Sequence, residues 1–426
     1  MSLAEPQDLQ EDAGLICSAS AIFDQIAFDE AFAVAQGLPR AEGRAALFAH
    51  LQGAIKTGRT TIASAFMAEP FLSRPTTGAY AYLTDCVIKS TLRISRELLH
   101  PNHAPTKGER LALIAVGGYG RGEMAPFSDV DLLFLTPYKI TAWVESVIES
   151  MLYLLWDLKL KVGHASRTVK DCLRLGSEDF TIRTAMLEHR FLAGDATLAQ
   201  ELDKRLWSDL FKDSGRDFIT AKLEERDKRH MRQGQRYVVE PHVKEGKGGL
   251  RALQSLFWIG KYIHKVRDAA ELVGVGVFTE EEFGAFVAAE DFLWAVRCHL
   301  HLLTGRPTEQ LTFDIQVQLA DVMRYSDKAG RRAVEIFMQD YFLHATEVGD
   351  LTRIVLTKME AIHAKDEPLL ERLFKRKPRV RADYTVIHNR IGINDETEWL
   401  SDKLNLLRIF EEALRTGMLI HPDAMR

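Results

Sequence analysis

Two short apolar runs constrain the fold of this chain more than any other feature of its sequence. Leu111–Val116 is apolar throughout and is closed by Gly117 and Gly118. Val130–Leu135 is apolar except at Asp131. An apolar run of about four to eight residues bounded by turn signals is typical of a buried strand. The sequence therefore predicts two strands of one small sheet, with a glycine turn after the first.

The sequence around these runs completes a small α/β unit inside a mainly helical chain. Trp143–Leu158 has the spacing of an amphipathic helix, and Lys161–Thr168 is a third short strand. Further predicted elements are a hairpin at Val380–Asn394 and the helices Ala41–Phe66, Ala79–Leu99 (after a break at Pro70–Pro75), Leu198–Gln233, Leu250–Val266, Glu280–Leu303, Gln316–Tyr325, Arg331–Ile362 and Leu404–Gly417. We predict an α+β fold with an N-terminal helical segment (1–75), the α/β domain (76–195), a helical domain (196–365) and a terminal hairpin and helix (366–426).

Composition excludes several classes of protein. The chain has 426 residues, of which 46% are apolar and 27% are charged, as in ordinary globular proteins. Its net charge of −5 disfavours a nucleic-acid partner, and no apolar run approaches the about 18 residues of a membrane helix. The first basic residue is Arg40, so the start lacks the pattern of a signal or transit peptide. We expect a cytoplasmic protein with no membrane partner, whose scattered cysteines are small buried apolar residues: Cys17, Cys86, Cys172 and Cys298.

Asp129 and Asp131 form the central candidate site. Because side chains alternate along a strand, both carboxylates project from the same face, whereas Val130 points the other way. Two adjacent carboxylates repel each other, and a hard divalent cation such as magnesium relieves that repulsion. Taken alone, an Asp-x-Asp pair is commonly just a solvated strand end.

Gly117 and Gly118 supply the other half of this candidate site. Glycines after a strand let main-chain amides approach phosphate oxygens closely, and Arg121 and Ser128 can add a charge and a hydroxyl. A lone Gly-Gly pair is usually only a turn. The order of the two motifs, with ten residues between Gly118 and Asp129, favours a metal and phosphate site over these simpler interpretations.

The segment 116–132 is similar to the motif of the polymerase-β-like nucleotidyltransferase superfamily, in which an apolar residue and two small residues precede Asp-apolar-Asp-apolar. The longer stretch GGYGRGEMAPFSDVDLLFL resembles the bacterial PII uridylyltransferase/uridylyl-removing family and, less closely, the glutamine synthetase adenylyltransferases. Val239–Gln254 and the region from Phe292 to Asp314 resemble the same uridylyltransferase family. The resemblance extends from about residue 75 to the end and implies a small nucleotidyltransferase domain with a mixed sheet, embedded in a helical chain.

The resemblance also implies roles for the candidate residues. Asp129 and Asp131 would bind magnesium, or manganese as the alternative ion, and Gly117 and Gly118 would hold the nucleotide phosphates. The implied reaction is attack by a tyrosine hydroxyl of the PII signal protein on the α-phosphate of UTP, which releases pyrophosphate.

A second cluster of basic residues stands among three glycines: Lys244, Lys247 and Arg251. We predict a loop that faces the triphosphate; the simpler interpretation is a loop of solvated charges before a helix. Two positions depart from the family pattern, because Ala252 stands where the family usually has Asp and His242 where it usually has Asn. A non-catalytic nucleotide-binding module and an adenylyltransferase therefore remain as alternatives.

No third catalytic carboxylate is evident in the predicted third strand. Glu188 is one candidate; otherwise it is an ordinary surface acid. His299 and His301 are two apart on a predicted helix, so they point in different directions and do not form a metal pair. Full-length family members also carry an HD-type hydrolase and glutamine-sensing ACT domains. The sequence has no His-Asp dipeptide, so we expect a shortened relative without uridylyl removal or glutamine sensing.

Overall fold

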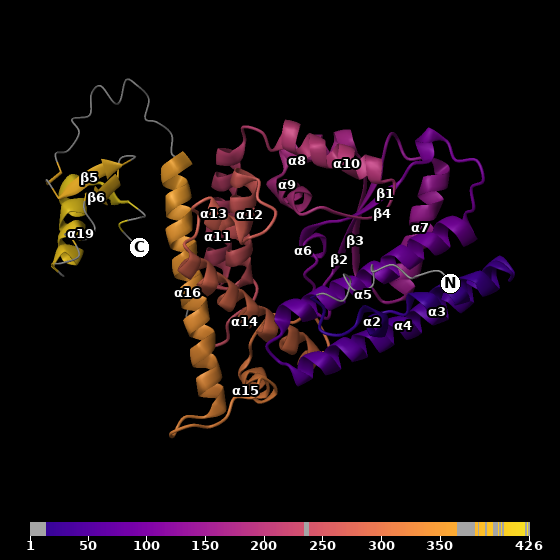
Figure 1. The fold of residues 1–426 in the computed structure, drawn as a ribbon, viewed down its shortest axis with the longest axis horizontal. Coiled ribbons are helices and arrows are strands. Elements are labelled where there is room, and N and C mark those ends of the chain that lie inside the picture. The colour runs from indigo at the N-terminus through magenta and orange to yellow at the C-terminus, as the bar shows by residue number, and fades with distance from the viewer. Residues whose placement is uncertain are drawn as a thin grey trace, which may run out of the picture.

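The computed structural model of the chain describes residues 14–233, 238–363, 380–381, 383–387, 390–394, 399, 402, 404–421 and 424 (Figure 1). The strands are β1 (Ala112–Ala115), β2 (Val130–Thr136), β3 (Val162–Thr168), β4 (Arg190–Gly194), β5 (Tyr384–Ile387), β6 (Arg390–Ile393) and β7 (Leu419–Ile420). The helices are α2 (Ala19–Ile22), α3 (Gln25–Gln36), α4 (Arg40–Ala68), α5 (Ser73–Arg93), α6 (Gly117–Gly120), α7 (Ala142–Asp157), α8 (Val169–Glu178), α9 (Phe180–Leu187), α10 (Ala196–Arg205), α11 (Gly215–Gln233), α12 (Leu250–His264), α13 (Glu271–Gly274), α14 (Glu280–Thr304), α15 (Phe313–Val322), α16 (Ala333–His363) and α19 (Asn405–Thr416). Three short helical segments of π or 3₁₀ type complete the set: η1 (Ile94–Leu99), η2 (Lys107–Glu109) and η3 (Leu206–Leu210).

The larger sheet is mixed and has the strand order β3-β2-β1-β4. β1 is antiparallel to both β2 and β4, whereas β2 and β3 are parallel and are joined through α7, as a parallel pair requires a crossover. These observations confirm the α+β class and the first three predicted strands. The sequence analysis missed β4, whose five residues begin with Arg190, a side chain that pairs with Asp85 on α5 at 2.6 Å.

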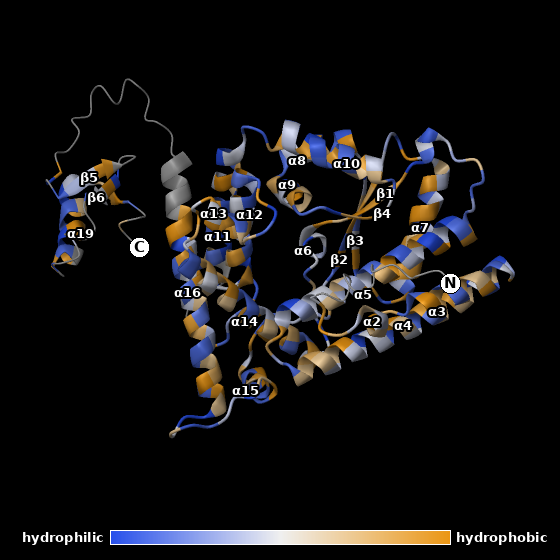
Figure 2. Ribbon diagram, in the orientation of Figure 1, coloured by the Kyte–Doolittle hydropathy of each residue, from blue (hydrophilic) through white to orange (hydrophobic). Residues whose placement is uncertain are grey.

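Alternate side chains of the sheet pack into two different cores. Leu113 and Leu132 pack with α2–α5 and α7, whereas Ile114 and Leu133 pack with α8–α12 and α14–α16. Figure 2 colours β1 and β2 mainly as hydrophobic, as expected for strands that are covered on both faces. The N-terminal helices therefore share a continuous core with one face of the sheet.

Two predicted helical stretches differ in detail from the structure. The single helix expected over Leu198–Gln233 is interrupted between η3 and α11, where Asp213 has a left-handed φ of 56°. The break expected at Pro70–Pro75 is shorter, because α5 begins at Ser73 and Pro75 occupies its first turn. Proline is tolerated there because the first amides of a helix have no intrahelical acceptor.

The C-terminal elements form a small cluster of their own. β5 and β6 pair antiparallel, which confirms the predicted hairpin, and β7 pairs parallel with β6. Tyr384, Ile391, Trp399 and Ile409 are buried together there. The domain boundary expected at 365/366 lies outside the described residues. Within the described part of the chain, no helix has the length and apolarity needed to cross a bilayer.

The cysteines lie where the sequence analysis expected them, with one exception. Cys86, Cys172 and Cys298 are buried, whereas Cys17 is partly exposed, because it lies in the irregular segment before α2. No disulfide joins these four cysteines, all of which belong to the described residues.

The glycine turn after β1 forms the short helix α6, which fits only because Gly120 lacks a side chain. A Cβ on Gly120 would overlap the main-chain oxygen of Glu188, just before β4, and would approach that of Ala115 at 3.0 Å. Neither main-chain oxygen can move without separating α6 from the sheet.

Replacing Gly120 with alanine tests this close approach. We expect Gly120→Ala to lower the free energy of unfolding by about 3 kcal/mol, as overpacking against main-chain atoms does. Gly53→Ala is the matched control, because a Cβ at this exposed position of α4 meets nothing within 4 Å. This substitution should raise the free energy of unfolding by at most about 1 kcal/mol. Urea denaturation measures both changes, and an undiminished stability of Gly120→Ala would contradict the packing described.

Candidate active site

Asp129 and Asp131 lie where β2 begins, beside the turn that follows β1. Asp131 alternates with Val130 and Leu132, so it points to the face that Leu133 shares with α8–α16. Both aspartates are exposed although the rest of β2 is buried, because they lie at the start of this inner strand. The two carboxylates therefore lie together at one solvent-accessible end of a buried strand.

The two carboxylates influence each other electrostatically. The pKa of Asp131 is raised by loss of hydration and by the charge of Asp129, while Lys244 and Lys161 oppose the increase. Lys161 Nζ lies 2.9 Å from Asp129 Oδ1, but that lysine is largely exposed and compensates little of the charge. A divalent cation bound between the carboxylates would remove the repulsion, and oxygen ligands of this kind suit Mg²⁺.

These two carboxylates would supply only part of a coordination shell. No cluster of three or more His, Cys, Asp or Glu residues suited to a metal occurs in the described ranges. Mg²⁺ is commonly held by one or two carboxylates together with substrate phosphates and water. The donor set at Asp129 and Asp131 therefore fits an ion that arrives with a nucleotide rather than one in a closed protein cage.

Glycines border Asp131 on two sides. Gly163 of β3 is the residue opposite Asp131 in the parallel pairing, and a Cβ there would lie 2.6 Å from Asp131 Oδ1. Gly117 has a left-handed φ of 62°, and a Cβ there would lie 3.4 Å from Asp131 Oδ2. The sequence analysis missed Gly163, although a glycine inside a strand is a recognised sign of close approach.

Arg121 and Ser128 are more engaged with the protein than the sequence suggested. Arg121 is mostly buried, and its guanidinium pairs with Glu188 at 2.5 Å and with Glu123 at 2.8 Å. The Ser128 hydroxyl accepts a hydrogen bond from the Ala125 N–H at 3.0 Å, which leaves the hydroxyl free to donate. Arg121 therefore supports the glycine turn through its two ion pairs.

Glu188 is neither a surface acid nor part of the carboxylate pair. Its side chain is 1% exposed and forms an ion pair with Arg121. Burial raises the pKa of Glu188, and the charge of Arg121 opposes that increase. The interpretation of Glu188 as an ordinary surface acid is therefore wrong.

The three basic residues of the second block point in different directions. The charge of Lys244 lowers the pKa of Asp131, although burial of that carboxyl outweighs the effect, and the same lysine also interacts with Glu309 and Glu245. Arg251 pairs with Glu245 at 3.1 Å and lies over the Trp258 ring at 5.2 Å. The charge of Lys247 acts on His230 of α11 and lowers the pKa of that histidine, although burial of the imidazole contributes more. Of the three, Lys244 is the residue whose charge acts on Asp131.

The two departures from the family pattern fit their surroundings. Ala252 is 5% exposed, and its methyl group lies in the core that α12 shares with the sheet. Nδ1 of His242 accepts a hydrogen bond from the Glu245 N–H at 3.0 Å. An asparagine side chain commonly makes this kind of bond to a main-chain N–H in a turn, so His242 preserves the local contact.

A buried group on α14 links the aspartate loop to the Lys244 loop. The Phe127 N–H donates to His301 Nδ1 at 3.4 Å, and His301 Nε2 lies 3.7 Å from Glu309. Glu309 pairs with Arg297 at 2.7 Å, and its main-chain oxygen accepts the Val243 N–H at 2.9 Å. Burial alone would raise the pKa of Glu309, but His301 and Arg297 outweigh it and lower the value to about 2.

The neighbouring histidine contacts a different part of the molecule. His299 Nε2 lies 2.9 Å from the Pro70 oxygen, and the ring stacks on Phe66 at 4.1 Å. His299 and His301 are both fully buried, yet only His301 reaches the loop that precedes Asp129. The pair therefore points in two directions, as its spacing predicts.

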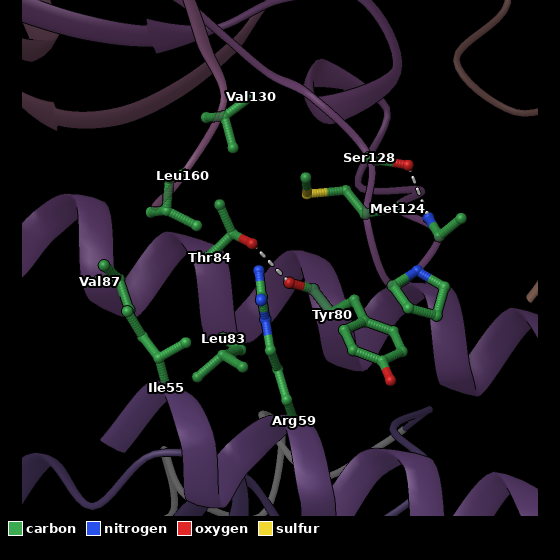
Figure 3. Close-up of a pocket in the computed structure, with 12 residues that line it drawn as sticks. Ile55, Arg59, Tyr80, Leu83, Thr84, Val87, Met124, Ser128, Val130 and Leu160 are labelled. Atoms are coloured by element: carbon green, nitrogen blue, oxygen red, sulfur yellow. Dashed lines mark hydrogen bonds between the residues drawn. The ribbon is translucent and has the colours of Figure 1, made fainter. Parts of the chain in front are cut away.

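The N-terminal helices support the aspartate loop from its other side. A cavity of about 20 Å³, room for about one water molecule, lies between α4, α5 and the residues 124–130. Figure 3 shows Arg59 extending from α4 toward Thr84 and the loop, and its guanidinium lies 5.7 Å from the centre of the Phe127 ring. This cavity is too small for a nucleotide, and Phe127 does not line it; the contact of Arg59 with the Phe127 ring is what connects α4 to the aspartate loop.

Comparison with known proteins agrees with this geometry. The nucleotidyltransferase domain family model matches residues 103–189, and the GlnD PII-uridylyltransferase family model matches residues 217–356. The strands β1–β3, the glycine turn and the aspartate pair all lie within the range that the nucleotidyltransferase domain model matches.

Curated relatives carry a more specific description. The chain is 65% identical over 394 residues to a bifunctional uridylyltransferase/uridylyl-removing enzyme of Ruegeria pomeroyi, a match that spans 92% of this chain and 43% of the relative. It is 58% identical over 419 residues to the enzyme of that description from Cereibacter sphaeroides, across 97% of this chain and 45% of the relative. The chain is therefore a homologue of the bifunctional uridylyltransferase/uridylyl-removing enzymes and spans a little under half of their length.

Lys244 and Lys247 provide a matched test of the second block. We expect Lys244→Ala to lower kcat/KM for nucleotide transfer at least about tenfold, because it removes a charge that faces Asp131. The kcat/KM of Lys247→Ala should stay within about threefold of the wild-type value, because the charge of Lys247 acts on His230. Pyrophosphate release measures both, and equal losses would contradict the assignment of Lys244 to the aspartates.

His301 and His299 test whether the buried link positions the catalytic loops. We expect His301→Ala to lower kcat about tenfold or more with little change in KM, since misplacing reacting groups slows the chemical step. His301→Asn should restore part of the rate by returning an acceptor to the Phe127 N–H. His299→Ala should lower the free energy of unfolding about as much as His301→Ala does, but should keep the wild-type kcat. If His299→Ala lowered kcat as much as His301→Ala, the role of His301 would be merely structural.

Proposed function

We propose that this chain transfers UMP from UTP to a tyrosine hydroxyl of a PII-type signalling protein and releases pyrophosphate. The observation that carries the proposal is the aspartate pair at the end of an inner strand, where Gly117 and Gly163 border Asp131 and the charge of Lys244 acts on it. The names of the matched family and of the relatives support uridylyl transfer and a PII-type acceptor. Because the chain spans less than half of those relatives, the proposal concerns transfer alone.

The residues of this site have distinct tasks in the proposed reaction. Asp129 and Asp131 would hold Mg²⁺, or Mn²⁺, and the ion would neutralise charge on the triphosphate. Gly117 leaves room for phosphate oxygens beside Asp131, Gly118 would offer its main-chain amide next to it, and Lys244 adds positive charge on the side of the helical region. A bond forms between the tyrosine oxygen and the α-phosphorus, the bond from that phosphorus to pyrophosphate breaks, and the tyrosine proton leaves to solvent.

The protein contributes mainly position and charge to such a transfer. Phosphoryl chemistry depends on alignment of nucleophile and leaving group and on neutralised charge more than on covalent steps by the enzyme. Arg121 and Glu188 hold the glycine turn, while His301 and Arg59 hold the segment that ends in Asp129. We also propose the cytoplasm as its compartment, since four cysteines without a disulfide among the described residues suit reducing conditions.

A donor-specificity assay with matched variants tests the function. Purified protein is incubated with a PII protein, Mg²⁺, 2-oxoglutarate, unlabelled ATP as an effector of PII, and α-labelled UTP; labelled ATP, CTP and GTP are run separately. We expect label on PII from UTP alone, and a loss of about a thousandfold or more in Asp129→Asn and Asp131→Asn, which retain their fold. Asp157→Asn is the control, because Asp157 is an exposed acid on α7 that pairs with Arg44.

Each alternative gives a different result in this assay. Label transferred from ATP, to PII or to glutamine synthetase, would replace the proposal with adenylyl transfer. Nucleotide binding without transfer from any donor would indicate a non-catalytic module. Full activity in both aspartate variants would remove the metal site from the mechanism.

A further inference from the structure

A second cavity of about 380 Å³ lies on the β4 side of the glycine turn, between the start of β4, α10 with η3, and the end of α12. We call it the α12 cavity. Its volume falls within the range of about 300–1,000 Å³ that small-molecule sites occupy. None of the residues that line it was singled out by the sequence motifs.

Positive charge dominates the lining of the α12 cavity. Lys261, Lys265 and Arg267 all line it, and none of these side chains forms an ion pair with a carboxylate among the described residues. Burial lowers the pKa of Lys261, although the charges of Glu188 and Asp203 oppose the decrease. Asp203 is the acidic residue of the lining, and it lies 3.5 Å from His189. Three cations therefore face the cavity against one carboxylate.

The opposite wall of the cavity is aromatic. Trp207 and Phe211 of the η3 region line it, with their rings nearly perpendicular at a centroid distance of 5.0 Å. Aromatic rings bind flat or apolar groups, whereas clustered Lys and Arg side chains bind phosphate. A ligand that satisfies both walls carries a phosphate at one end and a ring or apolar group at the other.

We infer that the α12 cavity binds a small phosphate-bearing molecule with an aromatic or apolar group, at a site separate from Asp129 and Asp131. The separation follows from the helix itself. Arg251 lies in the first turn of α12 and Lys261 lies ten residues later, so about 15 Å of helix separates the loop of Lys244 from the cavity.

The α12 cavity is connected to the glycine turn through charge. Lys261 interacts electrostatically with Glu188, which forms the buried ion pair with Arg121 directly after α6. A phosphate that binds Lys261 therefore also acts on the pair that supports the turn. The cavity is placed to influence nucleotide binding without contacting the nucleotide.

Phenyl phosphate is a suitable probe, because it joins one phosphate to one ring. Isothermal titration with the whole chain, in the presence of a chelator to exclude divalent cations, should show saturable binding at one site. The double variant Lys265→Ala/Arg267→Ala should weaken the affinity at least about tenfold, since each lost charge-assisted bond costs roughly that factor. Both side chains are exposed, so their loss leaves the fold intact.

Three controls locate the binding. Lys204→Ala/Lys212→Ala removes the same charge from exposed positions outside the cavity and should change the affinity less than twofold. Lys244→Ala should bind the probe as the wild type does. Trp207→Leu should weaken binding of phenyl phosphate several-fold but leave inorganic phosphate unaffected.

Three outcomes would overturn the inference: no saturable binding to the wild type, equal loss in the two double variants, or loss in Lys244→Ala. The readout requires no transferase activity, so it is independent of the outcome of the donor assay.

Discussion

Repulsion between two carboxylates is the physical constraint on which the rest of this structure depends. Asp129 and Asp131 extend from one strand toward the same region, and the charge of Asp129 disfavours the ionised form of Asp131. A strand buried on both faces can carry such a pair only at its end, where solvent, lysines and a metal ion can reach it. The glycines of the turn and of β3 leave the space that those partners need.

The structure surrounds this site with supports from both of its cores. Arg59, on α4, approaches the Phe127 ring from the side of the N-terminal core. His301, on α14, belongs to the other side of the sheet and accepts a hydrogen bond from the Phe127 N–H. Glu309 contacts His301 through its carboxylate and accepts a hydrogen bond from the Val243 N–H, so it connects His301 to the residue before Lys244. The alignment of the aspartates with Lys244 is thus a property of the whole helical framework and does not reside in the small sheet alone.

The sequence allowed the strands β1–β3 and the aspartate pair to be predicted because both depend on local pattern. An apolar run closed by glycines, and a period of two, are visible in a few consecutive residues. The strand β4 was missed because its stability comes from distant partners, such as the contact of Arg190 with Asp85, 105 residues away. The same reason hides His301, whose bond to Phe127 spans 174 residues. Lys244 and Lys247 look equivalent in the sequence, and only the path of the loop distinguishes them.

Gly163 shows how an inert residue can belong to a reactive site. It offers no functional group, yet Asp131 occupies the space that a side chain on β3 would fill. A methyl group at position 163 would approach the Asp131 carboxylate at 2.6 Å, so the carboxylate keeps its present position only while its neighbour across the strand pair has no side chain.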